Sequence, residues 1–449
     1  MKSRVISFKD VISSLRFDGS FHNAEANVYD KVIRLHSNHT LSYYCKDIFT
    51  SGRNKRVYTT KEFGYPFLSN SDVVSANPYL SCNYSSKKYG FDENAVLKEG
   101  MILTGRVGAI GQTAFVPAYL EKEKAMGSDN IIRICVNPEF KNGFIYAYLA
   151  SRIGKLSFWK HATGGVQPFI TDAMVSKLPI PDFPNEFQKE VDDLIHESAK
   201  LREEATDALT GAHRIIEMNI HILNNKKSSR VPIQSIISSH NKRFEAFYHT
   251  SNNRAIYDYI TSNFEYKTLG EVTSRIFRPG IFKREYVSNG VTFLGGADIL
   301  MAIPSSDKKL SFRQVEKMPE LKVKKDWILI TCGGTIGNTV LIDSQLEKCV
   351  ISQHVMRVVP KDGILKGYLY AVLSSSIGKE LITMFTTGSV IPQIEAHHLE
   401  LVPIPFLERK EMVKIDSLVS SYVSKIEKSK EKELKAIRMV EEEIEKWNN

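Results

Sequence analysis

The chain has 449 residues, more than one ordinary hydrophobic core can use, so two or three domains are expected. Its composition, 42% hydrophobic and 25% charged, is that of a globular protein, and no apolar run reaches the 18 residues of a membrane span. The 60 basic and 51 acidic residues give a net charge of +9, which modestly favours a polyanionic partner such as nucleic acid.

The amino terminus and the cysteines indicate where the protein is expected to reside. The first ten residues lack the apolar core of a signal peptide. The cysteines are widely spaced and form no C-x-x-C pair, so we expect reduced thiols in the cytoplasm instead of disulfides or a zinc site. They are Cys45, Cys82, Cys135, Cys332 and Cys349.

The first predicted domain, residues 1–183, has the pattern of a mixed α and β fold. Apolar runs rich in β-branched residues predict strands over residues 100–104 and 131–136. A short apolar stretch over residues 143–149 predicts a helix.

A long helix is predicted next, in residues 184–226. Apolar or small residues recur at alternating steps of three and four, the heptad spacing of a helix that packs along another helix. The heptad pattern runs from Phe187 to Ile222, and Pro184 stands just upstream of it, where proline is tolerated best. The seam is formed by Val191, Leu194, Ser198, Leu201, Ala205, Ala208, Ala212, Ile215, Asn219 and Ile222.

The rest of the chain repeats this layout. The same short segments occur twice, in one order, at a separation that drifts only from 228 to 224 residues, so the chain contains a duplicated unit. The matched pairs are Arg16-Phe17-Asp18 with Arg243-Phe244-Glu245, Ile48-Phe49 with Ile276-Phe277, Lys55-Arg56 with Lys283-Arg284, Phe67-Leu68 with Phe293-Leu294, Gly108-Ala109-Ile110-Gly111 with Gly334-Thr335-Ile336-Gly337, Ile153-Gly154-Lys155 with Ile377-Gly378-Lys379, and Pro179-Ile180-Pro181 with Pro403-Ile404-Pro405.

The second copy begins after a polar break at residues 224–229. Its predicted domain spans residues 227–405, with strands over 327–331 and 355–359 and a short helix over 367–373. A second long helix is predicted over residues 406–449, with a stutter at Lys430. Its seam contains Met412, Ile415, Val419, Tyr422, Ile426, Leu434, Ile437, Ile444 and Trp447. Two helices of matched length are natural partners for each other.

The motifs do not assemble a catalytic site. The glycine clusters at residues 105–111 and 333–337 fit neither a P-loop nor a dinucleotide fingerprint, so we interpret them as tight turns between strands. Asn77-Pro78-Tyr79 lacks the second proline of an amine-methylating loop. Asp182 and Glu186 are better explained by a helix start than by a metal site, and the pair His397-His398 has no second ligand pair nearby.

Two kinds of polar segment are candidates for contacts with DNA. The loops at residues 160–168 and 385–393 carry hydroxyl, amide and basic groups on a glycine-rich backbone, and two basic stretches are suited to phosphate. For each segment a solvated connector is the alternative. The candidates are Arg53, Asn54, Lys55, Arg56, Arg106, Lys160, His161, Thr163, Gln167, Lys283, Arg284, Thr386, Thr387, Ser389 and Gln393.

The whole arrangement resembles the specificity (S) subunit of type I restriction-modification systems. The resemblance rests on the order domain, helix, domain, helix, on the duplicated Ile-Leu segment that ends in Gly-x-Ile-Gly, and on the Pro-Ile-Pro before each long helix. The Arg-Phe-Asp triplet at residues 16–18 also matches the family's signal at each domain start. Glu245 departs from the aspartate of that signal, and residues 184–188 only loosely match the family's helix start.

The resemblance implies an α+β protein without catalysis of its own. Two tandem target recognition domains would each read one half of a bipartite, asymmetric site in duplex DNA. The long helices would pair as an antiparallel coiled coil that sets the gap between the half-sites, through Val191, Leu194, Leu201, Ile215, Ile222, Val419, Tyr422, Ile426, Ile437 and Ile444. Two methyltransferase (M) subunits would supply S-adenosylmethionine and methylate adenine, and restriction (R) subunits would supply ATP- and Mg-dependent translocation and cleavage.

Two other hypotheses remain open from the residues. One is a target-recognition subunit of another methyltransferase-based phage-defence complex, which the sequence does not distinguish from type I. The other is a coiled-coil adaptor that binds only protein, which DNA binding by the chain would exclude.

Overall fold

The computed structural model describes residues 6–22, 25–53, 55–220, 231–237, 239, 242–244, 248–249, 252–388 and 392–447. The predicted residues Asn54, Ile222, Glu245 and Ser389 and the break at 224–229 lie outside these ranges. The chain divides into two compact units: unit 1 contains Met1–Glu203 and Lys428–Asn449, and unit 2 contains Glu204–Glu427. Each long helix therefore contributes one segment to each unit.

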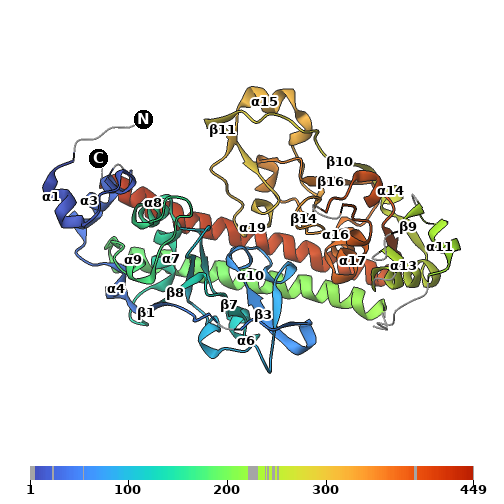
Figure 1. Ribbon diagram of the computed structural model, residues 1–449, viewed down its shortest axis with the longest axis horizontal. Coiled ribbons are helices and arrows are strands. Elements are labelled where there is room, and N and C mark those ends of the chain that lie inside the picture. Colours follow the sequence, from blue (N-terminus) through green and yellow to red (C-terminus); the bar gives the residue numbers. More distant parts are fainter. Residues whose placement is uncertain are drawn as a thin grey trace. The chain divides into compact units, whose positions relative to one another are not determined.

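Unit 1 is a mixed α/β fold (Figure 1). Its helices are α1 (Phe8–Ser14), α2 (Gly19–His22), α3 (Ala26–His36), α4 (Leu41–Tyr44), α5 (Asn70–Val73), α6 (Ala118–Lys122), α7 (Asn142–Ala150), α8 (Arg152–His161), α9 (Asp172–Val175) and the first part of α10 (Asn185–Asn219). Its strands are β1 (Cys45–Thr50), β2 (Tyr58–Thr59), β3 (Gly64–Leu68), β4 (Asn83–Ser86), β5 (Ile102–Gly105), β6 (Thr113–Phe115), β7 (Met126–Gly127) and β8 (Ile131–Val136). The final part of α19 (Arg409–Lys446) completes the unit.

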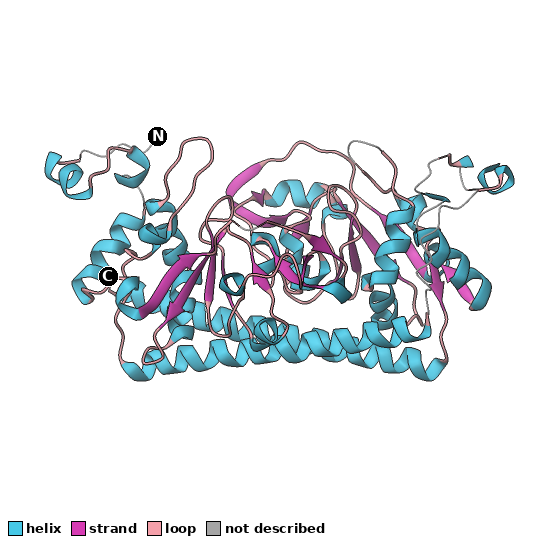
Figure 2. Ribbon diagram, turned by 60° about the horizontal axis from the view of Figure 1, so that its bottom comes forward, coloured by secondary structure: helices cyan, strands magenta, loops and turns pink. Residues whose placement is uncertain are grey.

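Unit 2 follows the same plan. Its helices are α11 (Ile233–Ile237), α13 (Asn252–Asn263), α14 (Leu269–Val272), α15 (Phe312–Lys317), α16 (Lys366–Ser374), α17 (Ser376–Met384) and α18 (Ala396–Leu399). Its strands are β9 (Tyr266–Thr268), β10 (Thr273–Phe277), β11 (Tyr286–Leu294), β12 (Lys309–Leu310), β13 (Ile328–Thr331), β14 (Thr339–Leu341), β15 (Val350–Ile351), β16 (Val355–Pro360) and β17 (Pro403–Pro405). Figure 2 distinguishes strands from helices by colour.

The main sheet has the same strand order in both units. In unit 1 the order is β1-β8-β5-β6, and in unit 2 it is β10-β16-β13-β14, with every neighbouring pair antiparallel. The strands predicted at residues 100–104, 131–136, 327–331 and 355–359 are β5, β8, β13 and β16. Their side chains are buried at most positions, which explains why each strand is mostly apolar.

A smaller sheet in each unit contains one parallel strand pair. In unit 1 the order is β2-β4-β3-β7, with Phe67 opposite Met126. In unit 2 the order is β12-β11-β15, with Phe293 opposite Val350. The two parallel pairs therefore occupy matched positions of the sequence repeat.

In each unit an aspartate of the long helix forms a hydrogen bond with the start of a short helix. Asp192 of α10 accepts a hydrogen bond from the backbone N–H of Gly143 at 2.7 Å, and Asp416 of α19 accepts one from Gly367 at 2.8 Å. Each bond satisfies a free N–H at the start of α7 or α16. A Cβ atom on Gly143 would stand 2.8 Å from the Asp192 carboxylate, so this close approach requires glycine.

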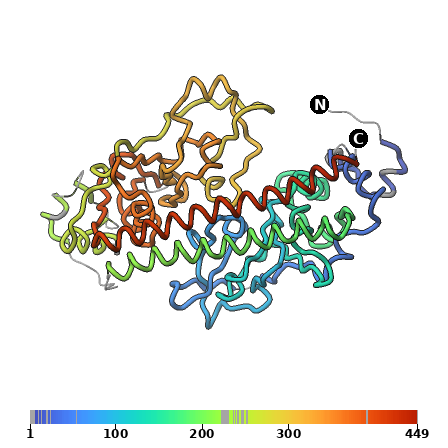
Figure 3. Tube along the Cα trace, turned by 180° about the vertical axis from the view of Figure 1, so that it is seen from behind, coloured from blue at the N-terminus to red at the C-terminus, as the bar shows by residue number. Residues whose placement is uncertain are grey.

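Within each unit the α10 and α19 segments lie side by side and run in opposite directions (Figure 3). In unit 1, Ser198 bonds to Ser429, and Glu197 pairs with Lys432. In unit 2, Glu204 pairs with Lys425 at 2.8 Å. The predicted α+β fold with antiparallel long helices is therefore confirmed.

The buried face of α10 is wider than the predicted seam. Val191, Ser198, Ala205 and Ala212 are buried as expected, but so are further residues beside them, because each segment also packs into the core of its own unit. These further residues are Ile195, Thr206, Leu209, Ile216 and Ile220.

Asn219 does not belong to the seam. Its side chain is exposed and donates to the Ile215 carbonyl of its own helix at 2.8 Å. Of the predicted coiled-coil residues, Val191, Val419, Ile426 and Ile444 are buried, and Leu194, Leu201, Ile215, Tyr422 and Ile437 are half-buried.

Candidate nucleic-acid interface

The two polar loops have the same backbone geometry. In unit 1, Thr163 and Phe169 exchange two backbone hydrogen bonds, of 2.9 and 2.7 Å, and so close a narrow loop. In unit 2, Thr387 and Gln393 exchange bonds of 2.9 and 2.8 Å. The tip of the unit 1 loop is exposed, including Gln167.

Each loop is joined to the glycine turn of its own unit. Ile170 donates its N–H to the Arg106 carbonyl at 2.9 Å, and Ile394 donates to the Cys332 carbonyl at 3.2 Å. The predicted turns are present between β5 and β6 and between β13 and β14, with positive φ at both glycines that flank each Gly-x-x-Gly. The fold thus brings together, in each unit, two segments that the sequence suggested separately.

An arginine near the start of each copy of the sequence repeat bonds to the backbone of the polar loop. Arg16 donates from Nη2 to the Ala162 carbonyl at 3.1 Å, and Arg243 donates to the Thr386 carbonyl at 2.8 Å. The guanidinium of Arg16 lies 4.9 Å from the ring of Phe21. The arginine of the Arg-Phe triplet therefore has a structural role in holding the loop.

Lys160 and His161 both have partners inside unit 1. Lys160 is buried and pairs with the buried carboxylate of Asp30. His161 Nδ1 bonds to the Ser157 carbonyl at 2.9 Å, and burial lowers the pKa of His161. Lys160, which was predicted to contact DNA, therefore has a counterion in the core of unit 1, and its contact with DNA stays a prediction.

The other loop candidates are only partly accessible. Thr163, Thr386 and Thr387 are half-buried, and the Thr387 hydroxyl donates to the Gln393 carbonyl at 3.3 Å. Gln393 itself is exposed, and Arg106 is half-buried. Gln167 and Gln393 are thus the loop amides that reach the surface.

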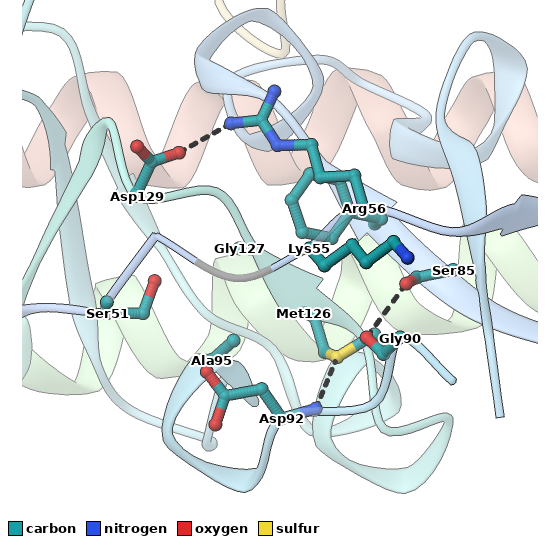
Figure 4. Close-up of a pocket in the computed structure, with 12 residues that line it drawn as sticks. Ser51, Lys55, Arg56, Ser85, Gly90, Asp92, Ala95, Met126, Gly127 and Asp129 are labelled. Atoms are coloured by element: carbon teal, nitrogen blue, oxygen red, sulfur yellow. Dashed lines mark hydrogen bonds and ion pairs between the residues drawn. The ribbon is translucent and has the colours of Figure 1, made fainter. Parts of the chain in front are cut away.

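The basic stretch of unit 1 surrounds a carboxylate. Arg56 Nη2 donates to Asp129 Oδ1 at 2.5 Å, and Arg53 Nε lies 3.4 Å from Asp129 Oδ2 (Figure 4 shows Arg56 turned toward Asp129). The Arg53 side chain is 89% exposed and that of Arg56 47%, so only Arg56 is partly enclosed. Lys55 is exposed and lines a pocket together with Arg56 and Asp129.

The basic stretch of unit 2 has an amide in place of the carboxylate. Arg284 Nη2 donates to Gln353 Oε1 at 3.3 Å. Lys283 is exposed, and its carbonyl accepts from Gln314 Nε2 at 2.7 Å. Both basic stretches therefore present charge at the surface, and each holds one arginine in a defined direction.

Sequence reasoning missed two buried arginines behind these stretches. Arg133 on β8 and Arg357 on β16 are fully buried, and each donates only to backbone carbonyls among the hydrogen bonds that the described residues make. Burial lowers the pKa of each to about 10, so both remain charged at neutral pH. A signal was available, since an arginine interrupts the apolar strand at the same place in both copies.

The described residues offer no group of three or more His, Cys, Asp or Glu side chains suited to a metal ion. His397 and His398 lie with ring centroids 4.0 Å apart, and His398 contacts the start of α18 through Glu395. Among the same residues, no helix is long and apolar enough to cross a bilayer.

Comparison with known proteins shows which family the second half of the chain resembles. Residues 261–436 match the family described as the type I restriction modification DNA specificity domain. The resemblance noted in the sequence is thereby confirmed. Among curated proteins, the chain is similar to the type I restriction enzyme MjaIX specificity subunit of Methanocaldococcus jannaschii, with 24% identity over 168 residues. The match covers 36% of this chain and 38% of that protein.

Solved structures of similar subunits match most of the chain. The S subunit of a type I restriction-modification system from M. genitalium has 14% identity and a TM-score of 0.33, covering 91% of this chain and 95% of that one. The HsdS subunit from Thermoanaerobacter tengcongensis has 17% identity and a TM-score of 0.29, with the same coverage of 91% and 95%.

Proposed function

We propose that this chain is the DNA-recognition subunit of a type I restriction-modification complex and performs no catalysis itself. The observation that carries the proposal is the match of residues 261–436 to a DNA specificity domain, together with a second copy of the same fold earlier in the chain. A protein with two recognition domains suits a DNA target with two half-sites. Because the units differ at many loop positions, the two half-sites differ in sequence.

In this proposal the domains keep the bounds expected from the sequence. Residues 1–183 and 227–405 are the target recognition domains, and residues 184–226 and 406–449 are the helices that set the gap between half-sites. The antiparallel order of α10 and α19 within each unit supports this use, since a stiff helix pair is a suitable spacer.

In this proposal, partner subunits supply the methylation and cleavage that are not assigned to this chain. Methyltransferase subunits, two per specificity subunit, hold S-adenosylmethionine and methylate adenine in the recognised duplex. Restriction subunits add ATP- and Mg-dependent cleavage. The surfaces of the paired helices, which are rich in Lys and Glu, face these partners.

The proposal is tested by mapping DNA methylation in cells that express the chain with the methyltransferase encoded next to it. We expect methylated adenines within one bipartite, asymmetric motif that has an unread gap. A continuous palindrome would contradict the two-reader model. Methylation that does not change when the chain is deleted would contradict the proposed function altogether.

A salt titration separates this function from that of an adaptor that binds only protein. The complex should bind duplex DNA with an affinity that falls steeply as salt increases, because phosphate contacts release counterions. Binding of methyltransferase without any binding of DNA would favour the adaptor.

A further inference from the structure

Both units carry the same three-residue arrangement at matched positions of the repeat. In unit 1, Arg56 donates to Asp129 at 2.5 Å, and its guanidinium lies 5.5 Å from the centroid of the Phe67 ring. In unit 2, Arg284 donates to Gln353 at 3.3 Å, and its guanidinium lies 5.6 Å from the Phe293 ring. We call these two groups the arginine modules: Arg56, Phe67 and Asp129 in unit 1, and Arg284, Phe293 and Gln353 in unit 2.

The parallel strand pair places the ring and the acceptor together. Phe67 on β3 stands opposite Met126 of β7, and Asp129 follows two residues after that strand. Phe293 on β11 stands opposite Val350 of β15, with Gln353 two residues after β15. Asp129 has a side chain only 13% exposed, and Gln353 is buried, so both acceptors are parts of the fold and not loose surface groups.

In unit 1 the turn that carries the acceptor is wrapped around a buried arginine. Arg133 donates to the carbonyls of Gly127 at 2.6 Å and Ile131 at 2.8 Å, on either side of Asp129. Buried carbonyls bonded to a cation are strongly held, since charge-assisted bonds exceed neutral ones. The backbone around Asp129 is therefore fixed before any ligand arrives.

Unit 2 repeats this support. Arg357 donates to the carbonyls of Ile351 at 2.5 Å and Val355 at 2.6 Å, on either side of Gln353. The exposed arginine of each module thus contacts a ring and a hydrogen-bond acceptor. The backbone on either side of that acceptor is in turn bonded to a buried arginine. A contact that supplied only positive charge would not need this support.

We propose that each arginine module reads one guanine of its half-site, with the arginine donating to O6 and N7 in the major groove. This inference rests on the proposed function and deepens it. Arginine presents two parallel donors that match this base edge, and discrimination requires that the guanidinium plane be fixed. The phenylalanine and the acceptor fix that plane, so Asp129 and Gln353 are positioning residues.

The two modules differ in charge, so loss of the acceptor should affect DNA binding differently in each. Asp129 offsets the charge of Arg56 and also contacts Arg53, whereas Gln353 is neutral. Replacing Asp129 with alanine removes the acceptor altogether, so it should loosen Arg56 and raise the net charge by one. Preference for the guanine should then fall while affinity for unrelated duplex rises.

The test selects bound sequences from a library of randomised duplexes with the full-length chain and its co-expressed methyltransferase. The variants are Arg56→Gln and Arg284→Gln, with Arg53→Gln as the matched control. Each module variant should lose preference for guanine at a single base pair, a different one for each variant, by about 5- to 150-fold, since a bidentate pair contributes about 1–3 kcal/mol. Arg53→Gln should weaken all sequences alike.

Two results would overturn the inference. One is a uniform loss of affinity in Arg56→Gln and Arg284→Gln with a salt slope reduced by about one, the behaviour of a phosphate contact. The other is an unchanged guanine preference in Asp129→Ala. If the wild-type complex selects no motif, the proposed function itself fails, and the module inference fails with it. Thermal unfolding of each variant, matched to wild type, assigns the changes to recognition.

Discussion

At the scale of the residue, a substitution of Lys160 distinguishes a role in the core from a role in contacting DNA. It pairs with Asp30 inside unit 1, and the repeat places Met384, also buried, at the equivalent position of unit 2. Lys160→Met should leave the Asp30 carboxylate buried without its cation, which typically costs about 3–5 kcal/mol. The loss should be measurable as a lower free energy of unfolding of the full chain in denaturant.

The double variant Lys160→Met with Asp30→Leu is the control. Replacing both members of a buried ion pair by apolar groups is often neutral, so most of the stability should return. DNA affinity per folded molecule should stay at the wild-type value in both variants. A single variant that is fully stable but binds DNA more weakly would return Lys160 to the interface.

At the scale of the element, the helix pair is polar in one unit and apolar in the other. In unit 1, Arg202 of α10 pairs with Glu433 of α19 at 2.5 Å, and Tyr146 of α7 donates to the same carboxylate. Burial and the nearby carboxylate raise the pKa of Tyr146 well above its usual value, so it remains a donor. In unit 2 the offset of 224 residues puts Ile426 and Leu209, both buried, at these places.

This difference predicts that methionine at position 202 and methionine at position 426 have unequal effects on stability. Arg202→Met should destabilise unit 1 by about 3–5 kcal/mol, because it leaves Glu433 buried without its cation. Ile426→Met, the equivalent change in unit 2, should cost less than about 1.5 kcal/mol, as conservative apolar exchanges do. Hydrogen exchange measured by mass spectrometry shows which unit loses stability in each variant. Equal losses from both changes would mean that the Arg202–Glu433 pair contributes little.

The elements show which parts of the fold a sequence can specify. The central strands and the short helices follow from local patterns, since β5, β8, β13 and β16 are apolar runs of strand length. The buried face of α10 exceeds the heptad because Ile195 and Ile216 pack on their own unit, which periodicity alone does not encode. The role of Lys160 depends on Asp30, which is distant in the sequence, so the residue type gave no local signal. Arg133 did give one, as an arginine within an apolar strand, but the carbonyls that it bonds follow only from the fold.

The candidate interface was predictable to a similar extent. The polar loops and basic stretches were identified from composition, and the structure joins each loop to its glycine turn. Asp129 and Gln353 were not identified, because a lone acid and a lone amide after a two-residue strand look like ordinary turn residues. Only the fold brings them to Arg56 and Arg284.

At the scale of the whole molecule, the proposed spacer predicts how the target changes with helix length. Insertions belong where the two units divide, between Glu203 and Glu204 in α10 and between Glu427 and Lys428 in α19. Four residues in each helix add about 6 Å of rise and slightly more than one turn. Every pair inside each unit keeps its register, including Ser198 with Ser429.

The doubly extended chain should therefore keep both half-sites and lengthen the unread gap by about one to two base pairs, since duplex DNA rises about 3.4 Å per base pair. Methylation mapping reads both quantities at once. Inserting four residues in α10 alone is the control: it shifts α10 against α19, so pairs such as Glu204 with Lys425 or Ser198 with Ser429 must break, and assembly should be lost. An unchanged gap in the doubly extended chain would show that the helices do not set the distance, whereas altered half-sites would show that they take part in reading.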